Sequence, residues 1–275
     1  MRPNHHLCFP IALLLFCACG PKTDEAKKAV DRPAATSHPD TLSFSLIKLH
    51  KTCGNCALAD SGCAQVTFHY PRYEESPSVP QLAYINDFIQ EQLSISLLSG
   101  DTLDNPESAA EEFIADYSDF ISDNPPYITA WTWEKNIQRL YESAQILVCR
   151  LREYSFTGGA HGRQVTQYWN FDLETGYPIS LSKLVIREKF PALQNFAEQT
   201  FRKRNGIPCD ESLEKYGYWF EDDRFRLPEN FGIAADTLTF LYNPYEIAAY
   251  AYGTITIRLP IDAIKDCLQT AWISP

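Results

Sequence analysis

The chain has 275 residues, 45% of them hydrophobic and 13% aromatic, which is enough apolar material for one large domain or two small ones. Its formal net charge of −11 argues against binding to nucleic acid and against adhesion to anionic lipid. The charge favours a cationic partner or serves solubility alone.

The first 18 residues are predicted to be a bacterial lipoprotein signal peptide. They contain the apolar run LCFPIALLLFCAC, which ends at Ala18-Cys19. This run is shorter than the roughly 20 residues that a membrane-spanning helix needs, and it has the length of a signal-peptide core. We expect Cys19 to become the lipidated N-terminus and to anchor the protein in a membrane. The alternative is an ordinary cleaved signal peptide with a chance cysteine.

Residues 19–40 are predicted to be a flexible tether, because they are polar and lack aromatic side chains. Within them, Lys22-Thr23-Asp24-Glu25 resembles the acidic export tags of some surface lipoproteins of Gram-negative bacteria. We therefore expect a lipid-anchored protein of a Gram-negative cell envelope, either periplasmic or exposed at the surface.

The remaining segments show strand and helix patterns that cluster along the chain and do not alternate strictly. Apolar side chains at a period of two indicate strands, and apolar side chains at a period near 3.6 indicate helices. The predicted strands cover 41–50, 64–73, 128–142, 143–156, 163–173, 236–243 and 252–260. The predicted helices cover 82–98, a segment opened by Asn105-Pro106, 181–206 and 261–271. Because strands and helices cluster, the sequence predicts an α+β fold of two sub-domains, with antiparallel sheets packed with helices.

Six cysteines follow the tether. An exported protein meets an oxidising compartment, which favours disulfides. A structural zinc site is the alternative for the first cluster, since His50 and His69 flank three cysteines at plausible ligand spacing. The six residues are Cys53, Cys56, Cys63, Cys149, Cys209 and Cys267.

Several motifs carry a family resemblance. They are Tyr70-Pro71, Ile85-Asn86, the loop YSFTGGAHG at 154–162, FDLETGYPISLSKL and PENFGIAADTLTFLYNPYEIAAYAYGTITIRLP. Together they resemble a two-part extracytoplasmic module of unassigned function. That module accompanies the catalytic domain of a peptidoglycan deacetylase (PdaC-type) and forms the outer half of a lysozyme-sensing anti-sigma factor (RsiV-like).

The resemblance implies a PdaC-like domain over 41–160 and an RsiV-like domain over 161–275. We expect the module to act alone on its lipid anchor, because the sequence shows neither a polysaccharide deacetylase domain nor a transmembrane helix. A boundary near residue 160 leaves an even number of cysteines on each side. It therefore predicts a Cys209–Cys267 disulfide and pairing of the other four among themselves.

The loop SFTGGAHG at 155–162 raises the question of chemistry. Gly158 and Gly159 can adopt positive φ without steric cost, so the loop is predicted to bend sharply, with His161 holding the bend. No recognised nucleophile, triad or metal-ligand spacing surrounds His161, and no cofactor or metal is predicted. The candidate ligand-binding residues are Tyr154, Thr157, Gly158, Gly159, His161, Tyr245 and Glu246.

Two functions remain open from the sequence. The favoured one is a non-catalytic envelope module that binds a cell-wall glycan or a cationic wall-targeting protein such as lysozyme. The alternative is a hydrolase that acts on peptidoglycan or another glycan, using His161 with an acid such as Glu246. The lack of a catalytic constellation favours the binding module.

Overall fold

Two β-sheets and five α-helices form the fold in a computed structural model that describes residues 42–57, 62–125 and 129–273. All of these residues belong to one compact unit, Ser37–Pro275. The predicted signal peptide, the lipidated Cys19 and the tether 19–40 lie outside the described residues. None of the described helices is both long enough and apolar enough to cross a bilayer.

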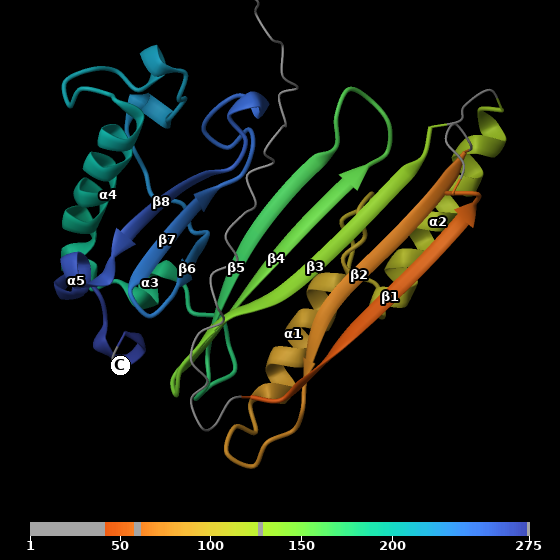
Figure 1. Cartoon of the computed structure of the whole chain (residues 1–275), viewed down its shortest axis with the longest axis horizontal. Coiled ribbons are helices and arrows are strands. Elements are labelled where there is room, and N and C mark those ends of the chain that lie inside the picture. The colour runs from red at the N-terminus through yellow and green to blue at the C-terminus, as the bar shows by residue number, and fades with distance from the viewer. Residues whose placement is uncertain (1–41, 58–61, 126–128, 274–275) are drawn as a thin grey trace, which may run out of the picture. The chain divides into compact units, whose positions relative to one another are not determined.

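The larger sheet has five strands in the order β1-β2-β3-β4-β5 (Figure 1). All neighbours are antiparallel except β2 and β3, which are parallel. The strands are β1 (Phe44–Gly54), β2 (Cys63–Tyr73), β3 (Trp131–Glu142), β4 (Ile146–Phe156) and β5 (Arg163–Asp172). The predicted α+β class is confirmed, with the parallel pair as a detail that local patterns did not indicate. A parallel pair needs a crossover connection, and two helices supply it.

The crossover helices α1 (Leu82–Ser94) and α2 (Pro106–Asp123) lie behind the larger sheet in Figure 1. Asn105 begins α2, as predicted, because its Oδ1 accepts the amide hydrogen of Ser108 at 2.8 Å. Apolar side chains from both helices and one face of the sheet form a single buried cluster. Burial of this face fixes the register of the strands, because a slip of one residue would expose it.

Lys135 is a charged residue inside this cluster, with only 4% of its surface exposed. Its Nζ donates to the carbonyl oxygens of Gln92, Leu93 and Ile95 at the end of α1, at 2.9, 3.5 and 3.4 Å. The last carbonyls of a helix have no partner within the helix. Lys135, which lies on β3, therefore caps the C-terminal end of α1. Burial lowers the pKa of Lys135 to about 8, and the charge of Glu153 opposes that shift.

The smaller sheet has three antiparallel strands, β6 (Phe231–Ile233), β7 (Thr237–Tyr242) and β8 (Ile255–Pro260). The chain reaches it through α3 (Leu181–Leu184) and α4 (Phe190–Asn205), and α5 (Ile261–Ile264) follows it. A second hydrophobic cluster lies among these elements. The short strand β6 was not predicted, because three residues are too few to show a periodic pattern.

Strand β4 contributes to both hydrophobic clusters. Ile146 and Val148 belong to the cluster of the smaller sheet, whereas Leu147 and Cys149 belong to the cluster under α1 and α2. A strand buried on both faces has a continuous apolar run in its sequence, as Ile-Leu-Val-Cys shows here. The predicted domain ranges 41–160 and 161–275 stay a prediction.

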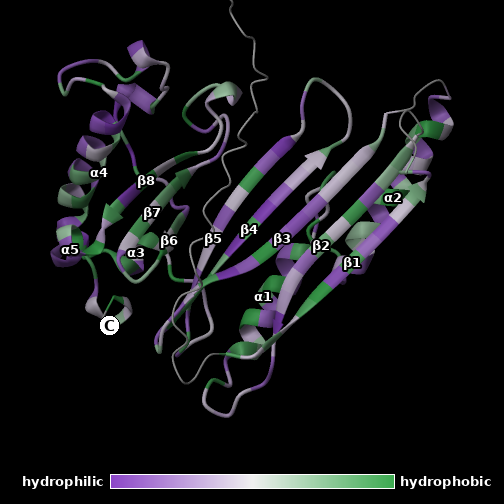
Figure 2. Cartoon of the chain, viewed as in Figure 1, coloured by the Kyte–Doolittle hydropathy of each residue, from purple (hydrophilic) through white to green (hydrophobic). Residues whose placement is uncertain are grey.

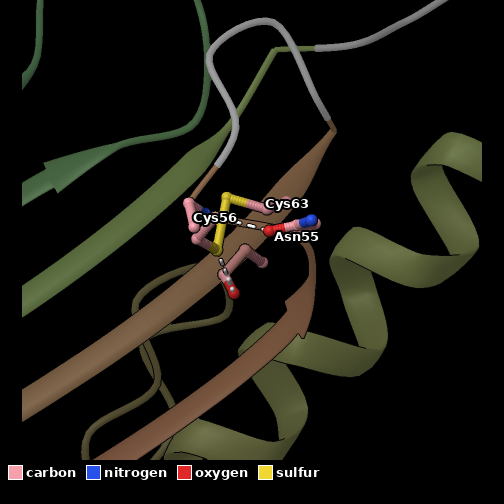
Figure 3. The surroundings of a disulfide bond; sticks show 5 residues. Asn55, Cys56 and Cys63 are labelled. Atoms are coloured by element: carbon pink, nitrogen blue, oxygen red, sulfur yellow. Dashed lines mark hydrogen bonds between the residues drawn. A yellow bond between two sulfur atoms is a disulfide. The ribbon is translucent and has the colours of Figure 1, made fainter.

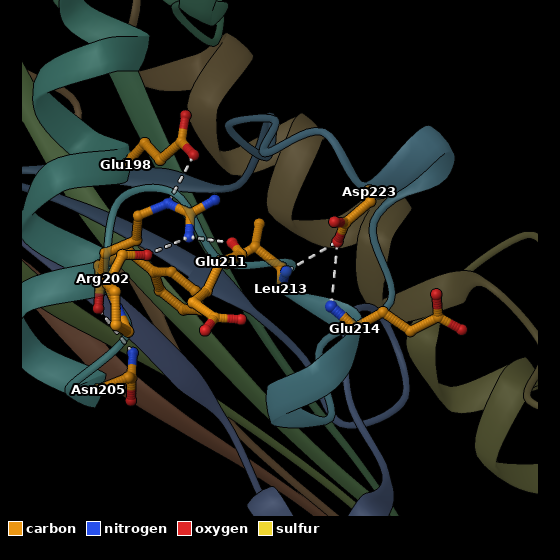
Figure 4. Close-up of polar contacts among 9 residues, drawn as sticks. Glu198, Arg202, Asn205, Glu211, Leu213, Glu214 and Asp223 are labelled. Atoms are coloured by element: carbon orange, nitrogen blue, oxygen red, sulfur yellow. Dashed lines mark hydrogen bonds and ion pairs between the residues drawn. The ribbon is translucent and has the colours of Figure 1, made fainter.

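The segment after α4 is held by Arg202 (Figure 4). Its guanidinium forms an ion pair with Glu198 at 2.8 Å and donates to the carbonyl oxygens of Pro208 and Glu211 at 3.0 and 2.8 Å. Further along, the carboxylate of Asp223 accepts the amide hydrogens of Leu213 and Glu214. These bonds keep the chain close to the C-terminal end of α4.

Cys56 and Cys63 form a disulfide between the end of β1 and the start of β2 (Figure 3). The prediction of pairing within the first four cysteines is confirmed for this pair alone. The zinc interpretation fails, because both sulfurs are committed to the disulfide. The described ranges also contain no group of His, Cys, Asp or Glu that could hold a metal ion. The other cysteines of the described part are free: Cys53, Cys149, Cys209 and Cys267.

The predicted Cys209–Cys267 disulfide is not formed, and helix α4 explains why. Cys209 follows the C-terminal end of α4, where Arg202 holds Pro208. Cys267 lies near the N-terminal end, because its carbonyl oxygen accepts the amide hydrogen of Ile186 at 2.9 Å. A helix of 16 residues spans about 24 Å, and a disulfide requires Cα atoms within about 7 Å. An even number of cysteines on each side of residue 160 carries no information about this separation.

Pairing of Cys53 with Cys149 is likewise not formed. Cys53 lies on β1 and Cys149 on β4, so β2 and β3 separate them. Neighbouring strands are about 4.8 Å apart, which places these two cysteines well beyond disulfide reach. Cys149 instead lies 3.4 Å from the hydroxyl of Tyr73 in the core.

The accessibility of the cysteine thiols gives a first test of the fold. In the native protein without reductant, we expect an alkylating reagent to label exposed Cys209 first and to leave Cys149 unmodified until unfolding. Burial raises the pKa of Cys149 to about 12, so the reactive thiolate is scarce as well as inaccessible. Mass spectrometry should find the peptides of Cys56 and Cys63 joined. A joined Cys209–Cys267 peptide would contradict this fold around α4.

A second test uses the buried Lys135. Its pKa is lowered from 10.5 to about 8, so between these pH values the unfolded chain binds more protons than the folded one. The wild type should therefore gain stability relative to Lys135→Met as the pH rises from 8 to 10.5, by up to about 3 kcal/mol.

Urea unfolding of both proteins at pH 7.5 and pH 10 measures this change. Tyr73 and Cys149 titrate equally in the two proteins, so their effects cancel in the difference. A difference in unfolding free energy that stays constant with pH would show that Lys135 has an ordinary pKa.

Candidate ligand-binding groove

The β4–β5 loop bends as the sequence predicts. Gly158 and Gly159 have φ values of 106° and 98°, a region that side-chain-bearing residues rarely adopt. Gly162 is buried at the end of the loop, and a Cβ atom there would overlap the ring of Tyr154. The glycines thus serve two different needs, namely positive φ at the bend and close approach of a tyrosine ring.

His161 joins this loop to the loop after β7. Its ring stacks on Tyr250, with centroids 3.9 Å apart and planes 15° from parallel. Its Nε2 lies 3.2 Å from the hydroxyl oxygen of Tyr245, and its Nδ1 lies 3.1 Å from the carbonyl oxygen of Gly162. A carbonyl only accepts, so Nδ1 carries the proton and Nε2 of the neutral ring accepts from Tyr245. The hydroxyl of Tyr250 donates to the same Gly162 oxygen at 3.0 Å.

Tyr245 is exposed, with 56% of its surface accessible, and His161 is exposed as well. The backbone of Tyr245 has a φ of 72°, which is unusual for a residue with a side chain. Glu246 stabilises that turn, because its two carboxylate oxygens accept hydrogen bonds from the backbone and side-chain amides of Asn243 at 2.9 and 3.2 Å. The carboxylate of Glu246 is therefore occupied within the turn and holds Tyr245 in place.

Three asparagine side chains connect β5 to the smaller sheet. Asn243 and Asn230 each accept an amide hydrogen of β5, from Thr166 at 2.7 Å and from Tyr168 at 2.9 Å. Both also donate to the carbonyl oxygen of Thr166, at 3.2 and 2.7 Å.

The third asparagine lies on β5 itself and bonds to the backbone of β6. Asn170 of β5 donates to the carbonyl oxygen of Phe231 at 2.7 Å and accepts the amide hydrogen of Ile233 at 2.9 Å. Beside it, the ring of Tyr168 lies so close to Gly232 that a Cβ atom there would overlap it. These contacts hold β6 against β5, and the bonds of Asn243 hold the start of the Tyr245 loop against the same strand.

A polar groove of about 630 Å³ lies between β3–β5 and β7–β8. Figure 2 shows hydrophilic stretches along β3, β4 and β5, which form one wall. Tyr154 connects the groove to the His161 cluster, since its ring also covers Gly162. The lining residues are Glu134, Asn136, Gln138, Arg150, Arg152, Glu153, Tyr154, Gln164, Val165, Thr166, Tyr168, Leu241, Thr254, Thr256 and Arg258.

A second groove, of about 790 Å³, lies between β1, β2 and α1. Its wall carries four carboxylates, and none of the predicted site residues lines it. The groove beside Tyr154 is the better candidate, because Tyr154 is the one predicted site residue that lines either groove and its ring also packs against Gly162 of the His161 loop.

The structure brings most of the predicted residues together. Tyr154, His161, Tyr245 and Glu246 belong to connected contacts, and Thr157, Gly158 and Gly159 shape the same loop. Sequence reasoning missed the partners of these residues and the polar groove wall. The signal for the wall was present in Arg-Leu-Arg at 150–152, where alternation places two arginines on one face of β4. That the predicted residues bind a ligand remains a prediction.

The chemistry available at His161 is limited. Its ring contacts two tyrosines and a backbone carbonyl oxygen, and none of these contacts involves a carboxylate, a serine or a cysteine. A catalytic histidine ordinarily needs such a partner within hydrogen-bond reach. The arrangement suits binding through an exposed aromatic face.

Comparisons with known proteins match the two halves of the chain separately. Residues 59–164 match the family described as Deacetylase PdaC. Residues 183–262 match a family described as a protein of unknown function, DUF3298. The chain is similar to the peptidoglycan-N-acetylmuramic acid deacetylase PdaC of Bacillus subtilis (strain 168), with 24% identity over 136 residues. That stretch covers 49% of this chain and 28% of that protein, so the chain spans little more than a quarter of its relative.

Two solved structures share the fold. A DUF3298 family member from Bacteroides fragilis NCTC 9343 superposes with a TM-score of 0.67 at 21% identity, covering 83% of this chain and 94% of that one. A DUF3298 family protein from Pseudomonas aeruginosa PAO1 gives a TM-score of 0.60 at 18% identity, covering 85% and 97%. At these identities the likeness establishes the fold alone. The resemblance to an RsiV-like anti-sigma factor stays a prediction.

The asparagine contacts can be tested by stability. Asn170→Leu should lower the free energy of unfolding by about 2–5 kcal/mol, because the carbonyl of Phe231 and the amide of Ile233 each lose a buried partner. Asn195→Ala, on the exposed side of α4, is the matched control and should stay within about 0.5 kcal/mol of the wild type. Chemical denaturation followed by tryptophan fluorescence measures both variants. Equal stability of Asn170→Leu and the control would mean that these contacts do not hold the sheets together.

Proposed function

We propose, from the premise that the chain joins a PdaC-type segment to a DUF3298 segment, that it is a non-catalytic binding module of the cell envelope that recognises a cell-wall glycan. The observation that carries this proposal is the exposed ring of Tyr245, which is held by His161 and Glu246 beside a polar groove. The name of the Bacillus subtilis relative, a peptidoglycan deacetylase, supports a cell-wall glycan as the ligand.

The groove has the side chains that a sugar chain requires. Sugar rings present apolar faces and many hydroxyl groups, so they suit a site that combines aromatic rings with amides and hydroxyls. Tyr154 and Tyr168 supply rings in the groove itself, and the exposed Tyr245 adds a ring in the adjoining His161 cluster. The amides and hydroxyls come from Asn136, Gln138, Gln164, Thr166, Thr254 and Thr256.

The rigid support of Tyr245 favours binding. A ring held by hydrogen bonds and by a fixed turn loses little freedom when a ligand arrives, so less of the interaction energy is spent on ordering. His161 supplies that support through its hydrogen bond with the hydroxyl of Tyr245, and Tyr250 stacks on the ring of His161. Their contacts explain the histidine among glycines as a structural element of a binding site.

The proposed location is the envelope of a Gram-negative bacterium, with the protein attached to a membrane through lipid on Cys19. The signal-like sequence 1–18 and the tether 19–40 motivate this placement. An extracytoplasmic location also agrees with a ligand that belongs to the cell wall.

The test is sedimentation of the full-length protein with purified peptidoglycan sacculi. Tyr245→Ala should weaken binding about three- to tenfold, because an aromatic contact contributes roughly 0.5–1.5 kcal/mol beyond its buried area. Tyr84→Ala is the matched control, since Tyr84 is exposed to a similar degree, 53%, and lies on α1 away from the groove. Thermal melts of both variants should remain near that of the wild type.

Two outcomes would overturn the proposal. Release or chemical modification of muropeptides by the wild type, lost in His161→Ala, would establish an enzyme at this loop. Failure of the wild type to sediment with sacculi, together with binding to a cationic protein such as lysozyme, would place the ligand among proteins instead.

A further inference from the structure

Three arginines face the groove, and none of them forms an ion pair with a carboxylate of the described residues. Arg150 and Arg152 come from β4, and Arg258 comes from β8. The ion pairs within the described ranges all involve other arginines and lysines. Arginines on a protein surface rich in acids usually have carboxylates within reach, and this chain has 35 acidic residues against 24 basic ones.

Neither carboxylate of the groove forms an ion pair with these arginines in the described part of the chain. Glu153 accepts a hydrogen bond from the indole nitrogen of Trp133 at 2.7 Å, which directs it toward the helix-covered side. Glu134 forms no ion pair with a described residue. The groove lining therefore carries three arginines against two carboxylates, an excess of one positive charge in a chain whose net charge is −11.

Arg150 is held in place before any ligand binds. Its guanidinium donates to the Oε1 of Gln138 at 2.7 Å, and its Nε is covered from solvent without a partner in the described structure. Burial lowers the pKa of Arg150, and the charge of Arg152 lowers it further, while Tyr168 opposes the shift. A guanidinium keeps its charge in proteins, so a partly desolvated one interacts more strongly with an arriving anion.

The geometry favours a carboxylate carried on a sugar chain. Arg150 and Arg152 are two residues apart on one strand face, about 7 Å from each other, and Arg258 approaches from the other sheet. The planar guanidinium matches the two oxygens of a carboxylate. Amides and threonine hydroxyls occupy the space between the arginines, where neutral sugar hydroxyls would lie.

We infer that the groove selects glycans that carry carboxylate groups, and that Arg150, Arg152 and Arg258 bind those groups. This inference rests on the proposed function and names the ligand class of the same site. The groove therefore prefers chains with lactyl or uronic carboxylates over neutral chains of N-acetylglucosamine.

The experiment compares two tetrasaccharides of equal backbone length by isothermal titration calorimetry with the full-length protein. One is chitotetraose, which is neutral. The other alternates N-acetylglucosamine with N-acetylmuramic acid and has been freed of peptide, so it adds two lactyl carboxylates. The wild type should bind the carboxylated chain at least about tenfold more tightly, since charge-assisted hydrogen bonds are roughly twice as strong as neutral ones. This preference should shrink as sodium chloride is raised.

Variants assign the preference to the groove. Arg152→Gln and Arg258→Gln should each weaken binding of the carboxylated chain about five- to tenfold and change chitotetraose binding by less than about twofold. Both side chains are exposed, so these variants are expected to fold. Arg187→Gln removes the same charge from an exposed position outside the groove and should change neither affinity.

Three results would overturn the inference. Equal affinity for both tetrasaccharides, unaltered in the arginine variants, would leave glycan binding intact but remove carboxylate selection. Sedimentation with sacculi without measurable affinity for either tetrasaccharide would place the recognised group elsewhere on the wall. Failure to bind sacculi at all would defeat the proposed function, and the inference with it.

Discussion

The arrangement of the two sheets depends on amide side chains that take the place of strand pairing at the edge of β5. A free strand edge presents unpaired amides and carbonyls, and Asn243, Asn230 and Asn170 satisfy several of them across the junction. An asparagine amide has the same donor and acceptor as a peptide group, so it can substitute for a strand without continuing the sheet. These contacts hold β6 and the start of the Tyr245 loop against β5.

Strand β4 determines where the core ends and the groove begins. On one of its faces, Ile146 and Val148 enter the hydrophobic cluster of the smaller sheet, while Arg150 and Arg152 further along the same face line the groove. The change from apolar to charged side chains therefore divides one surface into a part that is covered and a part that stays open. Packing of the smaller sheet and formation of the groove are consequences of the same strand.

Local features of this fold could be predicted from the sequence, because local interactions determine them. The alternation in β2, the cap at Asn105 and the positive φ of Gly158 and Gly159 all follow from the residues themselves. The partners of His161 could not be predicted, because they lie 84 and about 90 residues away in the sequence. The disulfide prediction for Cys209 failed for a similar reason: counting cysteines carries no information about the helix that separates them.

The negative net charge opposes an anionic ligand at long range, but screening by salt limits that repulsion inside the groove. At physiological ionic strength, charges are screened beyond about 8 Å, so the acids on distant surfaces act weakly inside the groove. The nearby arginines dominate there, because they are close to the ligand and because Arg150 is partly desolvated. Long-range repulsion still slows the encounter in free solution. The proposed lipid anchor offsets that cost, since a tether keeps the module at a high effective concentration beside the wall. An acidic surface with a basic groove therefore suits a protein that stays near its ligand and binds it only where the arginines can reach.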